Sequence, residues 1–241
     1  MGDGGAAVNQ LPIVEIFGPT IQGEGPASGQ LSSFIRLGGC NLACTWCDSA
    51  YTWDASRFDL REQIANMEVS TIMGRLPAAP VCVVTGGEPL LYQDRDAFRA
   101  LLGHIRARGA QVHIETNGTI VPSREVQDLV DTFVVSPKLG HAEAQKGRVS
   151  PALADGWGNI ASSHSDAHLK VVVKTRGDVF RAAEMAVSSG WDRRRVWVMP
   201  EGVDTETLDQ RWPDVCAWAI EAGVNVTHRL HVLAWGEERG H

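Results

Sequence analysis

The 241-residue sequence contains no apolar run of membrane-spanning length, and its first ten residues lack the basic start and apolar core of a secretion signal. We therefore expect a cytoplasmic protein with no membrane association. It also lacks an excess of positive charge, because 22 Lys and Arg stand against 29 Asp and Glu, which gives a formal net charge of −7. That balance argues against nucleic acid as a partner and favours a small-molecule substrate.

Cysteine is scarce too, and no second cysteine pair accompanies the one cluster, Cys40-x3-Cys44-x2-Cys47. A structural zinc site needs four ligands, whereas three thiolates suit an iron–sulfur cubane whose fourth iron takes a non-protein ligand. A zinc site completed by a distant residue and a disulfide cluster are the alternatives. The odd total of five cysteines disfavours disulfides. Cys82 and Cys216 are expected in the core.

The hydrophobic content of 44% supports one sizeable core, so we predict a single domain over residues 11–241 behind a disordered lead, residues 1–10. Buried-type strands alternate with helical segments about every thirty residues, a pattern typical of right-handed βαβ units. About six such units are fewer than the eight of a closed barrel. The predicted fold class is therefore α/β, as a partial, open TIM-like βα barrel with about six parallel strands.

The expected elements follow from periodicity and caps. Strands are predicted at 34–37, 81–85, 111–114, 132–135, 168–173 and 195–199, with a last one near 229–233. Helices are predicted from 59 to about 73, from 94, from 123 to 130 and from 178 to 189, with a later one that Pro213 breaks or restarts. The stretch 139–166 shows no regular pattern.

Polar motifs follow several of these strands directly. They are Gly86-Gly87-Glu88-Pro89, Glu115-Thr116-Asn117-Gly118, Ser136-Pro137-Lys138 and Met199-Pro200-Glu201-Gly202. Since the carboxyl ends of parallel strands meet at one rim, the motifs should converge there. For each residue taken singly, an ordinary strand-end turn or a rim hydrogen bond is the alternative.

Two features lie upstream of the cysteines. In strand 34–37, period two places Phe34 with Arg36 on one face, and a charge in an apolar strand needs either an anionic substrate or a neighbouring carboxylate. A glycine-bracketed turn presents Gln22 and Glu24, for which a solvated loop is the alternative.

The cysteine spacing followed by Gly-Gly-Glu-Pro one strand later resembles the radical S-adenosylmethionine (SAM) superfamily. Further motifs are similar to its 7-carboxy-7-deazaguanine synthase family over about residues 13–239. These are Gln22-Gly23-Glu24-Gly25, Phe34 to Leu42, Cys47-Asp48-Ser49, Tyr51-Thr52-Trp53-Asp54, Glu115 to Gly118 and Arg229-Leu230-His231.

This resemblance implies a [4Fe–4S] cluster on the three cysteines, with SAM on the open iron, and radical chemistry that belongs to the cofactor. The implied reaction is a Mg²⁺-dependent lyase-type ring contraction of 6-carboxy-5,6,7,8-tetrahydropterin to 7-carboxy-7-deazaguanine with release of ammonia. The product would serve 7-deazapurine biosynthesis, either queuosine by way of preQ0 or a natural product. An electron donor such as flavodoxin or ferredoxin and a homodimer are also implied.

The resemblance also implies roles for single residues. Those assigned to the SAM cofactor are Trp46, Gly86, Gly87, Glu88, Glu115, Asn117, Ser136, Lys138, Met199 and Glu201. Those assigned to the pterin are Gln22, Gly23, Glu24, Arg36, Gly87 and His231. Ser49 stands where many relatives carry threonine and is assigned to Mg²⁺, which accepts a hydroxyl oxygen.

Two rivals remain open. One is an activase that uses the same radical to abstract hydrogen from a glycine of a partner protein. The other is a non-enzymatic, zinc-stabilised binding module.

Overall fold

The computed structural model describes residues 9–147, 150–163, 166–236 and 238–241. Its strands are β1 (Gln10–Ile21), β2 (Leu31–Leu37), β3 (Ala65–Glu68), β4 (Val81–Gly86), β5 (Gln111–Thr116), β6 (Thr132–Val135), β7 (Ala167–Val173), β8 (Val196–Pro200) and β9 (Asn225–Val226). Its α-helices are α1 (Leu60–Gln63), α2 (Val69–Arg75), α3 (Asp96–Ala107), α4 (Arg124–Gln127), α5 (Trp157–Ser163), α6 (Arg176–Ser188), α7 (Thr205–Ala222) and α8 (Leu230–Trp235). None of the described helices is long and apolar enough to cross a bilayer.

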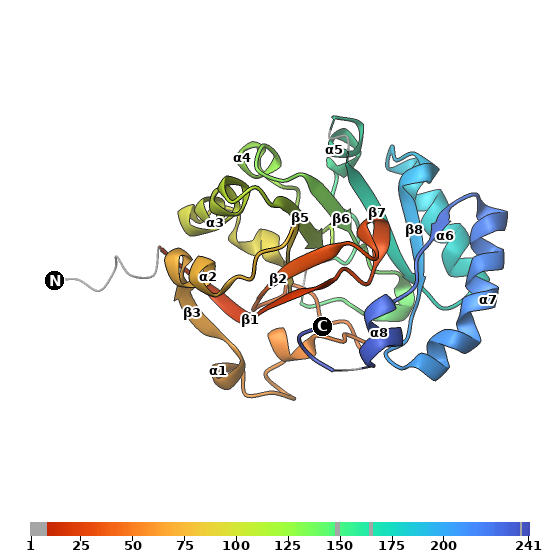
Figure 1. Ribbon diagram of the computed structural model, residues 1–241. Coiled ribbons are helices and arrows are strands. Elements are labelled where there is room, and N and C mark those ends of the chain that lie inside the picture. The colour runs from red at the N-terminus through yellow and green to blue at the C-terminus, as the bar shows by residue number, and fades with distance from the viewer. Residues whose placement is uncertain (1–8, 148–149, 164–165, 237) are drawn as a thin grey trace.

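The strands form one sheet in the order β3-β1-β2-β4-β5-β6-β7-β8-β9. Pairing is parallel from β2 through β9 and antiparallel at β1–β2 and β1–β3. The sheet is curved, and helices α3 to α7 cover its outer side (Figure 1). Since β3 and β9 do not pair with each other within the described chain, the barrel is open, as predicted. Six parallel strands of four residues or more, with the two-residue β9 as a seventh, match the expected number.

Alternating side chains along the strands separate the core from the cavity. Ile35, Val84 and Ile114 point outward into an apolar cluster with Phe98 and Leu101 of α3. Each such buried side chain contributes about 1.5–3 kcal/mol of transfer free energy.

The opposite face begins apolar and becomes polar toward the strand ends. Phe34 stacks on Phe17 with ring centroids 4.8 Å apart, and Arg36 and Thr85 follow on the same face. The predicted separation of Phe34 and Arg36 from Ile35 is therefore confirmed.

The single helix predicted from 59 to about 73 is wrong. Asp59 caps α1 by accepting the Arg61 N–H, as expected, but the helix ends at Gln63 because Ile64 is extended. Residues 65–68 then form β3, which pairs antiparallel with β1 from Ala65 opposite Ile13. A free edge on β1 therefore overrides the helical spacing of this segment.

The strand predicted near 229–233 is also wrong. The last strand is β9, and residues 230–235 form α8, which ends at Gly236 with φ +64. Leu230 and Leu233 are spaced at i, i+3, which fits one helical face as well as a strand. The contact of the Leu230 N–H with the Gly23 carbonyl, 2.9 Å, joins the start of α8 to the N-terminal loop.

Other differences concern helix limits. Helix α7 continues through Pro213 instead of breaking, because Leu208, Val215 and Ala219 anchor it to the core on both sides. Helices α3, α4 and α6 begin or end a few residues from the predicted positions, and α5 occupies part of 139–166. Of the expected disordered lead, residues 1–8 lie outside the described chain and Gln10 already belongs to β1.

Candidate active site

The carboxyl ends of the parallel strands open on a cavity of about 600 Å³. Every residue that the sequence assigned to a site lines it except Glu88, namely Gln22, Gly23, Glu24, Arg36, Cys40, Cys44, Trp46, Cys47, Ser49, Gly86, Gly87, Glu115, Asn117, Ser136, Lys138, Met199, Glu201 and His231. The predicted convergence on one rim is therefore confirmed. Which ligand each residue contacts stays a prediction.

The cysteine loop lies directly after β2 and forms one wall of this cavity. The backbone N–H of Leu42 donates to Cys40 Sγ and the indole N–H of Trp53 to Cys47 Sγ, both at 3.4 Å. Burial raises the pKa of Cys40 to about 11 and also raises that of Cys44. N–H donors aimed at these sulfurs suit thiolate ligands, and a bound metal cluster supplies the positive charge that such thiolates need.

The three thiols are not gathered around one ion. Among the described residues, no three His, Cys, Asp or Glu side chains lie close enough to hold a single metal ion. In a cubane each thiolate binds a different iron, so the sulfurs lie farther apart than ligands of one ion.

The segment after β6 supports the cysteine loop. The Ala43 N–H donates to the Ala144 carbonyl at 2.9 Å, and the Thr45 N–H to the Ala142 carbonyl at 3.0 Å. Ala142 and Ala144 also pack against Cys44 in a small apolar cluster. Residues 142–144, from the stretch 139–166 that showed no regular pattern in the sequence, thus hold the cysteine loop in place.

Gly86 and Gly87 are required by a close approach of the chain to itself. A Cβ on Gly86 would lie 2.2 Å from the Leu37 carbonyl oxygen, and one on Gly87 would lie 1.9 Å from that of Gly39. The glycines therefore let the end of β4 pack against the start of the cysteine loop. Their backbone also lines the cavity.

The Glu88 side chain is fully buried behind the cavity wall. It accepts hydrogen bonds from the Leu90 N–H at 2.9 Å, the Thr116 hydroxyl at 2.9 Å and the Asn117 N–H at 2.7 Å. Burial raises its pKa to about 7. Glu88 thus joins two strand-end motifs, and this placement does not favour the predicted contact of its side chain with the cofactor.

The other residues assigned to SAM lie near the cysteines. Asn117 donates to Asn41 at 2.8 Å, beside Cys40. Lys138 donates to the Ser136 hydroxyl at 2.9 Å, and its ammonium lies 5.6 Å from the Trp46 ring centre.

The end of β8 contributes two more residues assigned to SAM. Glu201 is paired with Arg211 and with Lys174, at 3.5 Å from the latter. Met199 is buried at the cavity edge.

Glu24 is the centre of a buried charge network that also lines the cavity. Its carboxylate lies 2.5 Å from Lys170 Nζ and 2.8 Å from Arg229 Nε. Burial alone would raise the pKa of Glu24, but Lys170 and Arg229 outweigh it and hold the pKa well below its usual range. Glu24 is therefore ionised at neutral pH.

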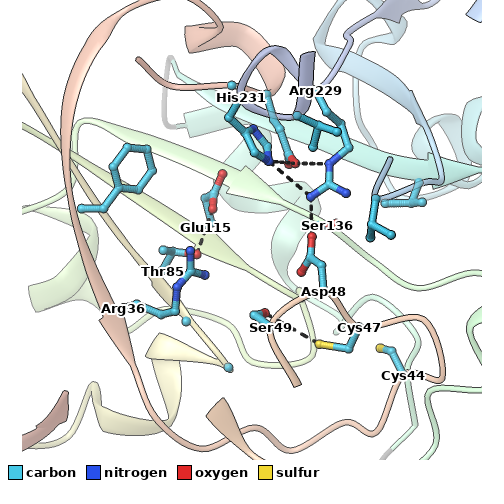
Figure 2. Close-up of a pocket in the computed structure, with 18 of the residues that line it drawn as sticks. Arg36, Cys44, Cys47, Asp48, Ser49, Thr85, Glu115, Ser136, Arg229 and His231 are labelled. Carbon is cyan, nitrogen blue, oxygen red and sulfur yellow. Dashed lines mark hydrogen bonds and ion pairs between the residues drawn. The ribbon is translucent and has the colours of Figure 1, made fainter. Parts of the chain in front are cut away.

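Glu115 belongs to this network. It accepts from the Thr85 hydroxyl at 2.8 Å, from Lys170 at 3.2 Å and from Gln22 at 3.3 Å. Figure 2 shows Thr85 and Glu115 on neighbouring strands facing the same space as Arg36. Glu115, assigned to SAM with Asn117, thus contacts Gln22, a residue assigned to the pterin.

For Arg36 the alternative prediction holds, because its Nε lies 2.8 Å from Glu15. The Tyr51 hydroxyl donates to the same Glu15 oxygen at 3.0 Å. The Arg36 side chain is 20% exposed and lines the cavity, so the guanidinium still faces the space in which a substrate is expected.

His231 packs against the turn that holds Gln22 and Glu24. A Cβ on Gly23 would lie 2.0 Å from its Nδ1. Burial lowers the pKa of His231, although Glu24 nearby opposes this effect, so the ring is neutral at pH 7.

Ser49 and Asp48 follow the last cysteine. Ser49 Oγ lies 3.7 Å from Cys47 Sγ and faces the cavity (Figure 2). Asp48 accepts from Arg229. The Ser49 hydroxyl is thus available as an oxygen ligand, next to an ionised carboxylate.

Several important residues were not found from the sequence. Lys170 interrupts the apolar strand β7, the same signal that selected Arg36, and could have been found in that way. Arg229 stands in one of the motifs that carried the resemblance, but its partners could not be found from it, because Glu24 and Asp48 lie 205 and 181 positions away in the chain.

Known proteins resemble this chain in sequence and in fold. Residues 34–219 match the radical SAM superfamily. The 7-carboxy-7-deazaguanine synthase of Pyrobaculum aerophilum is 34% identical over 98% of this chain and 99% of its own, and that of Bacillus cereus is 31% identical over 97% and 100%. The crystal structure of QueE from Escherichia coli has the same fold, with a TM-score of 0.64 at 23% identity over 92% of this chain and 95% of that one.

Proposed function

Because the chain belongs to the 7-carboxy-7-deazaguanine synthase family of the radical SAM superfamily, we propose that it forms 7-carboxy-7-deazaguanine from 6-carboxy-5,6,7,8-tetrahydropterin with release of ammonia. The enzyme is a carbon–nitrogen lyase of 7-deazapurine biosynthesis that uses a [4Fe–4S] cluster and SAM. One observation carries this assignment. A single cavity has the three cysteines on one wall and the Glu24, Lys170 and Glu115 network on another.

On the cofactor wall, Cys40, Cys44 and Cys47 hold three irons. When bound, the cluster and SAM would supply the radical chemistry that the reaction needs. The backbone of Gly87 receives the amino group of SAM, and the Lys138 ammonium, held by Ser136, attracts its carboxylate. Asn117 takes the ribose, and Met199 and Glu201 lie at the adenine.

On the substrate wall, ionised Glu24 accepts hydrogen bonds from the N–H groups of the pterin edge, and Gln22 completes that contact. The terminal nitrogens of Arg36 face the substrate carboxylate while Glu15 holds Nε. Ser49 provides an oxygen for Mg²⁺, which keeps several waters.

Finer features of the assignment are proposed as well. A one-electron carrier such as flavodoxin or ferredoxin supplies the electron, and the enzyme works as a homodimer of single-domain chains. The cysteines are all free thiols, which suits a reducing compartment such as the cytoplasm.

The test is anaerobic cluster reconstitution followed by incubation with reductant, SAM, Mg²⁺ and 6-carboxy-tetrahydropterin, with product detected by mass. Cys44→Ser should lose the cluster, whereas Cys216→Ser, on α7 and away from the cavity, should keep it. An intact cluster that cleaves SAM without forming product would refute the substrate and leave the superfamily standing.

The two rival functions have their own readouts in the same preparation. Turnover of SAM that is stimulated by a glycyl-radical enzyme instead of the pterin would establish the activase. Stoichiometric zinc without iron–sulfur absorption would establish the binding module.

A further inference from the structure

Trp53 contacts a cluster ligand directly. Its indole N–H lies 3.4 Å from Cys47 Sγ, closer than the Ser49 hydroxyl at 3.7 Å, while the nearest side-chain donor to Cys40 Sγ is the Asn117 amide at 3.9 Å. Among these three side chains, Trp53 is thus the best placed to donate to a cluster sulfur.

Lys146 brings a positive charge to the same place. Its ammonium donates to the Cys40 carbonyl at 3.0 Å and lies 5.2 Å from the centre of the Trp53 ring. The side chain is exposed, so this cation stands on the outer side of the cysteine loop. Lys146 comes two residues after Ala144. Since the carbonyls of Ala142 and Ala144 accept hydrogen bonds from the cysteine loop, the backbone just before Lys146 is held against that loop.

The neighbouring charges act in the opposite direction or are already occupied. Buried Glu88 lies close enough to Cys40 to disfavour its thiolate. Lys138 lies inside the cavity, holds Ser136 and is assigned to the carboxylate of SAM. Arg229 also reaches this loop, but it is already paired with Asp48 and Glu24. Lys146 therefore adds a positive charge on the outer side of the loop that remains there when SAM is bound.

Hydrogen bonds to cluster sulfurs and nearby positive charge stabilise the reduced cluster more than the oxidised one, because reduction adds one negative charge. We infer that Trp53 and Lys146 together raise the reduction potential of the cluster held by Cys40, Cys44 and Cys47. In the step concerned, one electron passes from an external low-potential one-electron carrier to the cluster, and no bond forms or breaks. The inference rests on the proposed cluster but not on the pterin.

The experiment is a redox titration of the reconstituted protein without pterin, in which electron paramagnetic resonance follows the reduced cluster. Trp53→Phe and Lys146→Met should each lower the midpoint potential, with about a tenfold fall in the ratio of reduced to oxidised cluster at the wild-type midpoint, which is ~59 mV for one electron. Trp53→His and Lys146→Arg, which keep an N–H and a charge, should stay near the wild type.

Two controls remove similar groups elsewhere. Trp197→Phe deletes an indole N–H that has no hydrogen-bond partner among the described residues, and Arg124→Met deletes an exposed cation of α4 that is paired with Asp128 at the end of that helix. Neither should move the midpoint.

A wild-type midpoint in Trp53→Phe or in Lys146→Met would overturn the inference, and so would equal shifts in Trp53→His and Trp53→Phe. The resonance signal counts only loaded clusters, so partial loading does not affect the result. If Trp53→Phe takes up no cluster, Lys146→Met decides, because its exposed side chain can change without loss of the fold.

Discussion

The Arg229 guanidinium joins Glu24 to Asp48. Its Nε lies 2.8 Å from Glu24, a terminal nitrogen pairs with Asp48, and the side chain is only 8% exposed. One cation just before α8 therefore ties the loop assigned to the substrate to the loop that carries the cysteines. The two ion pairs of Arg229 are important because the loops that they join come from distant parts of the chain.

Arg229→Lys should raise the KM for the pterin by about tenfold, equivalent to ~1.4 kcal/mol, with a smaller effect on uncoupled cleavage of SAM. A lysine is a single point charge and cannot hold two carboxylates as a guanidinium does. Steady-state kinetics with both readouts measure this. Arg176→Lys, in an exposed ion pair with Glu221, is the control. An unchanged KM would show that the bridge does not position the substrate loop.

Lys170→Met should lower the free energy of unfolding by about 3–5 kcal/mol at pH 8, because Glu24 and Glu115 lose the buried cation between them. The lowered pKa of Glu24 gives stability that is present above its unfolded value near 4.5 and is lost as pH falls. The difference from the wild type should therefore shrink in acid.

Urea unfolding of the apoprotein at several pH values measures the Lys170→Met effect. Lys174→Met, which removes a partly exposed partner of Glu201, is the control and should cost under about 1 kcal/mol. A Lys170→Met loss as small as that of the control would contradict the network.

Ser49→Thr should keep activity and change the Mg²⁺ concentration needed for half-maximal rate, because threonine keeps the oxygen and restricts its rotamers. Ser49→Ala should lose most of the Mg²⁺ stimulation. Rates across a Mg²⁺ titration provide the measurement, with the exposed Ser56→Thr as control. The same metal response in both Ser49 variants as in the wild type would sink the ligand assignment.

Glu88→Gln should change the pH dependence of stability. The folded pKa of Glu88, about 7, lies above the unfolded value of 4.5, so the neutral form favours folding. Its contribution is fully present below pH 4.5 and is lost as pH rises to about 7, by about 3 kcal/mol at ~1.4 kcal/mol per unit.

The stability advantage of the wild type over Glu88→Gln should accordingly shrink from pH 4.5 to pH 8 in denaturant titrations. Glu125→Gln, at an exposed helix start, corrects for general effects of removing a carboxyl. A constant difference between wild type and Glu88→Gln would mean that Glu88 does not titrate in this range.

Predictions from local sequence patterns were correct where the residues that determine an element lie within that element. The buried strands β4 to β8, the Asp59 and Ser123 caps and the cysteine spacing could all be predicted, because periodicity and capping act within a few residues. The helix expected through residues 65–68 failed because β1 offers a pairing edge that lies more than fifty positions upstream.

In the cavity, too, some features could be predicted from the sequence and others depended on contacts between distant residues. Parallel topology alone placed the strand-end motifs at one rim, since the carboxyl ends of parallel strands point the same way. The partners of each side chain did not follow from that topology. Glu88 turned away from the rim, and Glu115, which had been assigned to SAM, accepts a hydrogen bond from Gln22, 93 positions away.

The sequence by itself determined the α/β class, the three-cysteine loop and the order of the rim motifs, because spacing and alternation are properties of neighbouring residues. Only the tertiary structure decided that Arg229 would bridge Glu24 and Asp48, that Lys170 would lie between two glutamates and that Trp53 and Lys146 would meet at the cysteines. The reason is physical. Buried charges must find partners wherever folding brings them together, and those partners are distant in the chain.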